Sequence, residues 1–162
     1  MILQRAALAD IPVIRDLAHS IWWAHYPAII SEAQIDYMLG LMYSPEALER
    51  QMTEEGQVFW LALDSGTPMG FLAVSRQTAG AYMLHKFYLQ PTAQGKGHGS
   101  TAFWLLAEQY PDLQTIRLTV NRQNYKSINF YFKIGFRIEK CIDMPIGNGF
   151  EMNDFIMVWQ RK

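Results

Sequence analysis

The sequence predicts an α/β fold of the α+β kind, with one mixed and mostly antiparallel sheet. Two observations predict it. Residues 1–56 place apolar side chains at helical spacing, whereas apolar runs of strand length separated by turn residues begin at Gln57. Later, a strand (81–90), a glycine-rich loop, a helix (100–110) and a strand (115–120) follow in order. Two strands joined through a helix can pair in parallel, so the sheet is expected to be mixed.

Local signals place the helices that follow a short first strand. Asp10 and Pro12 begin the first helix, and Pro27 ends it, since proline cannot continue a helix. Ser31 and Ser44 are typical N-caps, because a serine hydroxyl accepts a hydrogen bond from a free N–H of the first helical turn. Three successive helices are therefore expected before the longer strands.

Turn residues divide most of the remaining chain into strands. The turn DSGTP at 64–68 joins the first two of them as a hairpin. Cys141, in the fifth, is expected to be buried as a small apolar side chain. The expected strands are 58–63, 69–75, 81–90, 115–120, 136–142 and 150–159.

Length and composition limit the class of protein. The chain has 162 residues, 50% hydrophobic and 18% charged, which is the mix of a single globular domain covering 1–162. A net charge of −1 without a run of Lys or Arg argues against nucleic acid and anionic membranes as partners. One cysteine excludes a disulfide framework and a cysteine-rich site, so no metal is expected. No apolar run approaches the ~20 residues that span a bilayer, and a cytoplasmic location is expected.

The stretch from Leu84 to Ser100 carries the clearest chemical signal. Gly95, Gly97 and Gly99 remove every second side chain from a loop that leads into a helix, so backbone N–H groups can converge on an anion such as phosphate. The loop is not a Walker A motif, because Lys96 is followed by glycine rather than Ser or Thr. It is not a dinucleotide fingerprint either, since its glycines are spaced by two throughout. A glycine-rich surface turn is the structural alternative.

Two motifs of this chain resemble those of the GCN5-related N-acetyltransferases, the GNAT superfamily. Gln94, Gly97 and Gly99 match the family's Q/R-x-x-G-x-G/A loop, and residues 120–136 match its second signature, with Ser127 in place of the usual alanine. The resemblance covers essentially the whole chain. It implies the GNAT fold, in which helices lie on both faces of the sheet and a central parallel strand pair splays apart to admit acetyl-CoA. It also implies an acetyl-CoA-dependent N-acetyltransferase.

The same resemblance implies which residues bind the cofactor. Backbone groups of the strand before the loop would bond the pantetheine amides, and the loop would hold the pyrophosphate. Asparagines, a serine and a lysine of the second signature would complete the set, with helix capping as the alternative role of the asparagines. The expected cofactor-binding residues are Phe87, Tyr88, Leu89, Gln94, Gly95, Lys96, Gly97, His98, Gly99, Ser100, Asn121, Asn124, Ser127 and Lys133.

The resemblance also suggests two catalytic residues. Tyr131 stands where the family commonly places the general acid that protonates the departing thiolate, and packing among neighbouring aromatic residues is its alternative role. His85 stands where many members carry a glutamate, so it is expected to accept the proton of the acceptor ammonium, directly or through water. Because His85 replaces a glutamate, a purely structural role for His85 is the alternative. Glu151 and Asp154 are the alternative bases.

The helical first third walls the acceptor site in this family. Trp22, Trp23, His25 and Tyr26 are therefore expected to contact the substrate together with Asp154, and core packing is the alternative for at least one tryptophan. The tail GNGFEMNDFIM resembles that of bacterial small-molecule acetyltransferases related to polyamine-acetylating enzymes, which favours a polyamine-like primary amine. A protein or peptide amine, and a non-catalytic acyl-CoA binding or sensing module, remain alternatives. The oligomeric state stays open, with a homodimer among the alternatives.

Overall fold

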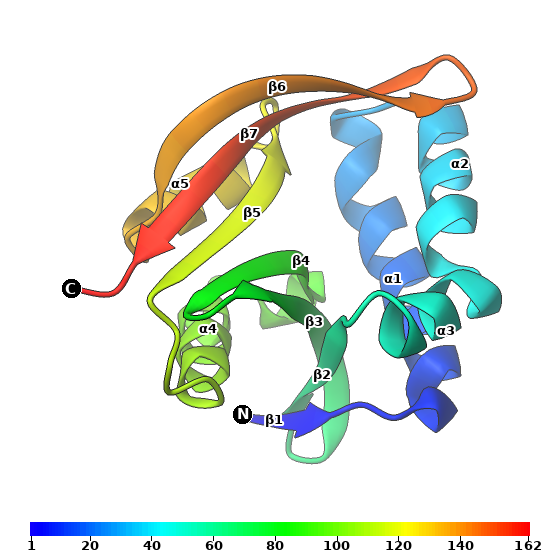
Figure 1. The fold of residues 1–162 in the computed structure, drawn as a ribbon. Coiled ribbons are helices and arrows are strands. Elements are labelled where there is room, and N and C mark those ends of the chain that lie inside the picture. The colour runs from blue at the N-terminus through cyan, green and yellow to red at the C-terminus, as the bar shows by residue number, and fades with distance from the viewer. The chain divides into compact units, whose positions relative to one another are not determined.

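The computed structural model describes every residue from Met1 to Lys162. Its strands form a seven-stranded sheet in the order β1-β2-β3-β4-β5-β7-β6, which confirms the predicted α/β class with a mixed sheet (Figure 1). The chain forms two compact units. The first consists of Met1–Ser75 and His85–Pro111, and the second consists of Arg76–Leu84 and Asp112–Lys162.

The elements are β1 (Ile2–Arg5), η1 (Leu8–Asp10), α1 (Ile11–His25), η2 (Tyr26–Ala28), α2 (Glu32–Tyr43), α3 (Pro45–Thr53), β2 (Val58–Asp64), β3 (Thr67–Thr78), β4 (Ala81–Leu89), η3 (Pro91–Ala93), α4 (His98–Glu108), β5 (Thr115–Asn121), α5 (Tyr125–Lys133), β6 (Arg137–Gly147) and β7 (Phe150–Gln160).

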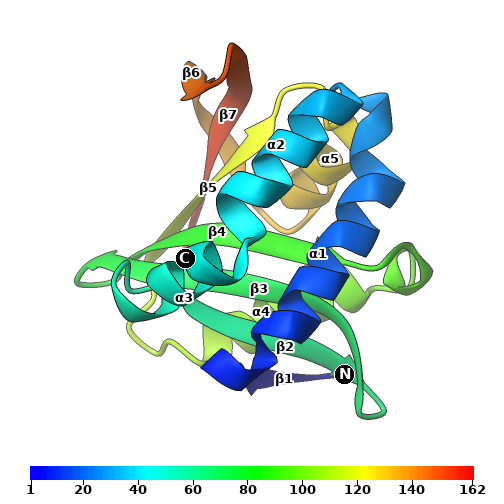
Figure 2. The same ribbon diagram turned by 90° about the vertical axis from the view of Figure 1, so that its right-hand side faces the viewer.

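In the first unit, helices cover both faces of the strands. The helices α1, α2 and α3 lie together on one face, and α4 lies on the opposite face (Figure 1 and Figure 2). Two of these helices begin at the predicted caps. The hydroxyl of Ser31 accepts the N–H of Gln34 at 3.1 Å, and that of Ser44 accepts the N–H of Ala47 at 3.1 Å. The predicted serine caps of α2 and α3 are thus confirmed, whereas the side chain of Asp10 does not cap α1 and accepts the N–H of Ala7 instead.

The strands β3 and β4 pack very closely at Gly70. A Cβ added to Gly70 would overlap the backbone oxygen of Tyr88 and lie 2.9 Å from the Cα of Leu89. Just beyond, the N–H of Gln90 donates to the carbonyl of Met69 at 2.8 Å. The end of β4 can therefore lie this close to β3 only because residue 70 carries no side chain.

The second unit contains the parallel strand pair. β4 and β5 pair in parallel through Ala81–Met83 and Thr115–Arg117, as the crossover helix predicts. β7 pairs antiparallel with both β5 and β6, which makes β6 the outer strand. α5 lies beside these strands and buries Ile128 and Tyr131 (Figure 1).

Two expectations from the sequence need correction. Cys141 is exposed, because it lies on the outer strand β6, where nearly all residues are exposed. Its Sγ accepts a hydrogen bond from Arg122 at 3.2 Å. The helix α4 begins at His98 rather than at residue 100, because Gly97 takes a left-handed conformation and lets the helix start inside the loop.

None of the helices is both long enough and apolar enough to pass through a membrane.

Replacing Gly70 tests the close packing of β3 on β4. Gly70→Ala is expected to lower the free energy of unfolding by about 2 kcal/mol or more, because the added methyl group forces the two backbones apart. Urea unfolding measures the change. The matched control is Gly40→Ala on α2, where an added Cβ meets nothing within 4 Å. It is expected to leave stability unchanged or to raise it by up to ~1 kcal/mol, since alanine favours helix. Wild-type stability of Gly70→Ala would contradict the packing.

Candidate functional site

The loop after β4 has the conformation that an anion site requires. Gly95 and Gly97 have φ of +76° and +79°, a region that glycine enters without strain, and a Cβ at either position would point into open space. Gly97 directly precedes α4. The free N–H groups of the first turn, which includes Gly99 and Ser100, and the helix dipole favour a negative charge there. These residues fit a phosphate group.

The glutamine of the motif holds this loop to the end of β4. The Nε2 of Gln94 donates to the carbonyl oxygen of Leu89 at 3.0 Å. At the other end of the loop, the half-buried ring of His98 has a buried Nδ1 without a hydrogen-bond partner. Lys96 is exposed between them. Gln94 thus has a structural role that the motif alone does not reveal.

Aromatic side chains of α1, η2 and β4 meet in one cluster. The ring of Trp22 lies 4.4 Å from that of Tyr26 and 5.9 Å from that of Tyr88, measured between centroids. The hydroxyls of Tyr26 and Tyr88 lie 3.4 Å apart. Phe71 and Tyr43 extend the cluster. The structure thus brings together two residues expected to contact the substrate and one expected on the cofactor strand.

The members of this cluster differ in exposure. Trp22 is 2% exposed and belongs to the core, as the alternative for one tryptophan predicts. Its buried indole N–H has no hydrogen-bond partner. Burial raises the pKa of the neighbouring Tyr43 well above its usual value, although the nearby indole N–H of Trp22 acts to lower it. Trp23, His25 and Tyr26 are half-buried and retain surface for a ligand.

His85, the expected base, lies on β4 with one ring nitrogen engaged. Its Nε2 lies 2.6 Å from the hydroxyl oxygen of Ser75. Burial, and to a lesser degree the ammonium of Lys86, lower the pKa of His85 to about 4, although Glu55 opposes both. The residue as a whole is exposed, so solvent screens part of this shift. The ring is nevertheless neutral at pH 7, because even an unperturbed imidazole has a pKa near 6.5.

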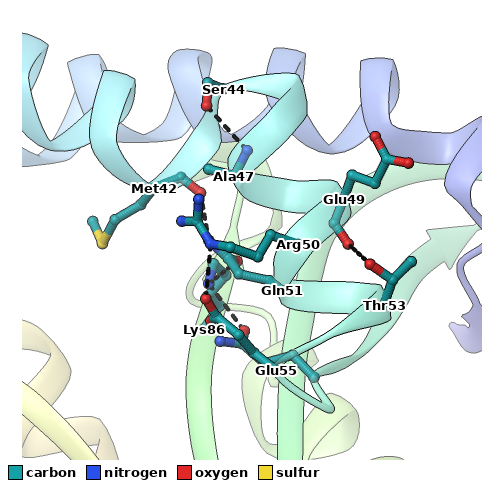
Figure 3. A network of polar contacts seen from close by, with 10 residues as sticks. Met42, Ser44, Ala47, Glu49, Arg50, Gln51, Thr53, Glu55 and Lys86 are labelled. Atoms are coloured by element: carbon teal, nitrogen blue, oxygen red, sulfur yellow. Dashed lines mark hydrogen bonds and ion pairs between the residues drawn. The ribbon is translucent and has the colours of Figure 1, made fainter.

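A buried lysine, which sequence reasoning missed, lies next to His85. Lys86 is 6% exposed. Its Nζ donates to the Oε1 of Gln51 at 2.7 Å and to the Oε1 of Gln57 at 3.2 Å (Figure 3). It also lies 5.6 Å from the ring centroid of Tyr43 and 5.2 Å from that of Phe59, within range of cation–π attraction.

The same contacts connect β4 to the helical layer. The Nε2 of Gln51, on α3, donates to the carbonyl oxygen of Met42, near the end of α2, at 2.9 Å (Figure 3). Lys86 therefore reaches the corner between two helices through Gln51. Burial lowers the pKa of Lys86 to about 8, and Glu55 opposes part of this effect. An ammonium with so low a pKa is close to losing its proton.

In the second unit, Tyr131 is packed between aromatic rings. It is 9% exposed, and its ring centroid lies 5.4 Å from that of Phe130 and 5.4 Å from that of Phe136. This is the packing role that the sequence offered as the alternative. The general-acid role stays a prediction, and a rigid ring is compatible with it.

The asparagines of the second signature have local partners. The Oδ1 of Asn124 accepts the N–H of Ser127 at 3.3 Å and caps α5, and the Oδ1 of Asn121 accepts the N–H of Gln123 at 2.9 Å. The capping role of Asn124 is thus confirmed, and cofactor contact by these asparagines stays a prediction. Ser127 is half-buried and Lys133 is exposed.

Asp154 is a buried carboxylate on an interior strand. It is 3% exposed on β7 and pairs in register with Asn121 on β5 and Ile142 on β6. Burial raises the pKa of Asp154 to about 6, although Arg122 and Thr119 lower it. Asp154 is therefore partly protonated in slightly acidic solution and fully ionised only above neutrality. Glu151, the other alternative base, is exposed.

Comparison with known proteins supports the sequence resemblance. Residues 16–136 match the model of the acetyltransferase (GNAT) family. The chain is 28% identical over 144 residues to spermidine N(1)-acetyltransferase of Thermoplasma acidophilum, with 85% of this chain and 88% of that protein covered. The crystal structure of PaiA N-acetyltransferase from Thermoplasma acidophilum in complex with coenzyme A has a TM-score of 0.81 and 26% identity, and covers 98% of both chains. A GCN5-related N-acetyltransferase structure from Rhodopseudomonas palustris has a TM-score of 0.80 at 16% identity, covers 98% of this chain and 94% of that chain, and supports the fold.

The buried ammonium predicts a pH dependence of stability. The pKa of Lys86 is about 8 in the folded chain against an ordinary 10.5. Between these values the unfolded chain binds a proton that the folded chain does not. The free energy of unfolding should therefore rise with pH across this interval, by up to about 3 kcal/mol. Below pH 8, the folded chain bears the full cost of burying the charged ammonium.

Urea unfolding at pH 7, 8, 9 and 10 tests this expectation. Lys86→Met should abolish the rise, whereas Lys140→Met, at an exposed position on β6, should retain it. The comparison uses the slope with pH rather than the stability at one pH, because Met at position 86 also leaves two amide oxygens without their donor. A slope that is the same in wild type and Lys86→Met would contradict the lowered pKa.

Proposed function

We propose, since the chain belongs to the acetyltransferase (GNAT) family, that it moves the acetyl group of acetyl-CoA to a primary amine of a small molecule. A polyamine is the acceptor class that we favour. One observation carries the proposal: a loop with glycines of positive φ joins β4 to the N-terminus of α4 in a chain of this family. The similarity to a spermidine N(1)-acetyltransferase supports the acceptor class.

The first unit would hold the donor. N–H groups from Gly95 to Ser100 would bind the pyrophosphate, with Lys96 adding positive charge. Backbone groups of Phe87, Tyr88 and Leu89 would bond the pantetheine amides. Acetyl-CoA supplies a thioester, which activates the acetyl group for attack by an amine. That a similar structure contains coenzyme A supports this assignment. The remaining residues that we assign to cofactor binding are Gln94, Asn121, Asn124, Ser127 and Lys133.

Two side chains would move the protons. Only a neutral amine is nucleophilic, and His85, neutral at pH 7, would take the proton of the ammonium. Tyr131 would donate its phenolic proton to the thiolate as it departs. Its packing between Phe130 and Phe136 supports this role, because a general acid must be held in one orientation.

The acceptor would be recognised by charge and by aromatic surface. The half-buried side chains Trp23, His25 and Tyr26, the last of which belongs to the aromatic cluster around Trp22, suit the aliphatic and cationic body of a polyamine. In the second unit, Asp154 is the residue that we assign to recognition of an ammonium group, since a buried carboxylate gains from a cation. A polyamine carries several such groups, whereas a simple monoamine carries one.

A panel of acceptors tests the function. Purified protein is incubated with acetyl-CoA and spermidine, propylamine or a peptide with a free N-terminus, and released thiol and acetylated product are measured. Fast thiol release with spermidine and slow release with propylamine is the expected result. Preference for the peptide would favour the protein-acetylating alternative. Binding of acetyl-CoA without thiol release for any amine would favour the non-catalytic module.

Removing the phenolic oxygen tests the proton donor. Tyr131→Phe is expected to lower kcat by about 10²-fold or more, because the thiolate then leaves without general-acid assistance. The rate of thiol release at saturating acetyl-CoA and spermidine measures kcat. Phe132→Leu, at an exposed position of the same helix, is the control and should keep wild-type kcat. Wild-type turnover in Tyr131→Phe, with chemistry rate-limiting, would remove the assignment.

Neutralising Asp154 tests acceptor recognition. Asp154→Asn is expected to raise KM for spermidine about 10-fold or more, because an ammonium loses its ionic partner, while KM for acetyl-CoA stays unchanged. In the wild type, KM for spermidine should fall as pH rises through about 6, where Asp154 ionises. The variant should lose this pH dependence, and Glu139→Gln, an exposed acid on β6, should retain it. An unchanged KM in Asp154→Asn would contradict the role.

A further inference from the structure

The hydrogen bond between Ser75 and His85 distinguishes the two nitrogens of the candidate base. The hydroxyl oxygen of Ser75 lies 2.6 Å from Nε2 of His85, and no other residue hydrogen-bonds the ring. Ser75 is 6% exposed on β3, whereas His85 is exposed. The Nε2 of His85 is thus engaged by a buried hydroxyl, and Nδ1 is the nitrogen that remains available.

The tautomer of the ring decides whether that nitrogen can act as a base. In neutral imidazole one nitrogen carries the proton and the other carries a lone pair. If Nε2–H donates to the Ser75 oxygen, Nδ1 has its lone pair free. If instead the serine donates to Nε2, the proton lies on Nδ1, and neither nitrogen can accept a proton from an amine without breaking the bond. The direction of this one hydrogen bond therefore controls the chemistry of His85.

We propose that Ser75 is a positioning residue for acetyl transfer: its hydroxyl oxygen accepts the Nε2–H of His85 and leaves Nδ1 as the atom that deprotonates the acceptor. The inference rests on the proposed function, in which His85 is the base. In the step itself, one N–H bond of the ammonium breaks, its electron pair stays on the amine nitrogen, and the proton moves to Nδ1. The resulting imidazolium keeps its Nε2–H bond to Ser75.

The charged groups near His85 act on its protonation. Lys86, the next residue on β4, and Glu55 are the charges that act on the ring. The ammonium of Lys86 is held in place by the amide oxygens of Gln51 and Gln57, and while it is charged, as it mostly is at pH 7, it repels a second proton on the ring. Glu55 acts in the opposite sense and is the weaker influence. The ring therefore stays neutral until the acceptor delivers its proton.

Nitrogen NMR tests the tautomer without reference to activity. Protein labelled with ¹⁵N-histidine at pH 7.5 gives distinct ring shifts for the two neutral forms, and the His85 signals are assigned by their loss in His85→Gln. The wild type is expected to show the Nε2–H form, and Ser75→Ala is expected to show a mixture of forms. An Nδ1–H form in the wild type, or an unchanged tautomer in Ser75→Ala, overturns the proposal.

Kinetics with spermidine and acetyl-CoA test the consequence. Ser75→Ala is expected to lower kcat about 10-fold or more, with KM for acetyl-CoA unchanged, because the ring loses its fixed tautomer and orientation. Ser75→Thr keeps the hydroxyl and should restore most of kcat. Ser31→Ala removes only the N-cap of α2 and should retain wild-type kcat, which separates positioning from a general loss of stability. Equal kcat in Ser75→Ala and the wild type overturns the proposal.

The two experiments separate this inference from the proposed function. If the wild type releases no thiol with any amine, the proposed function fails, and the positioning role fails with it even if NMR shows the expected tautomer. If the wild type acetylates spermidine but His85→Ala keeps the same pH–rate profile, the function stands and only the role of Ser75 is overturned. A fixed tautomer together with a kcat defect that Ser75→Thr rescues supports both.

Discussion

The absence of a side chain at Gly70 is the constraint on which the first unit depends. A Cβ there would overlap the backbone of β4 at Tyr88 and Leu89, so β3 can lie against the end of β4 only because residue 70 is glycine. From the other directions, Lys86 ties the strand to α3 through Gln51, and Gln94 bonds the carbonyl oxygen of Leu89. Three independent contacts thus fix the backbone of Phe87 to Leu89 before any ligand arrives. A strand held in this way loses little conformational freedom when it forms further hydrogen bonds, which is the condition for tight binding.

Lys86 shows how this fold accommodates a charge in its core. An ammonium that leaves water needs replacement partners, and here they are two amide oxygens and two aromatic faces rather than a carboxylate in direct contact. Neutral partners offset less of the desolvation cost than a carboxylate would, so the pKa of Lys86 falls to about 8. A positive charge that Glu55 offsets only in part also lies next to His85. The same arrangement that costs stability helps to keep the neighbouring imidazole neutral, and this links the buried Lys86, whose partners are Gln51 and Gln57, to the chemistry proposed for His85 on the same strand.

The features predicted from the sequence are those encoded by neighbouring residues. The serine caps, the strand, glycine loop and helix around Gly97, and the parallel pairing of β4 with β5 all follow from local signals, and the structure has them. Cys141 was expected to be buried and is exposed, because its burial depends on which strand is outermost, and the local pattern does not specify strand order. Lys86 was missed although a signal existed: it continues the alternation of the buried residues Tyr82 and Leu84. A lysine at an inward position is easily taken for a surface residue, since only the surrounding helices supply its partners.

In the candidate site, too, some features are encoded by neighbouring residues and others depend on residues far apart in the sequence. A phosphate loop can be recognised from a few consecutive residues, because its chemistry resides in the backbone and glycine is the residue that shapes it. The candidate base cannot, because the property that matters is which atom of His85 carries the proton. That property is decided by Ser75, ten residues earlier on another strand, and by an ammonium whose own position depends on Gln51 and Gln57. A histidine at a position usually occupied by glutamate is therefore not a simple replacement. A glutamate needs only to be ionised, whereas a histidine needs a neighbour that fixes its tautomer, and in this chain Ser75 is in place to do so.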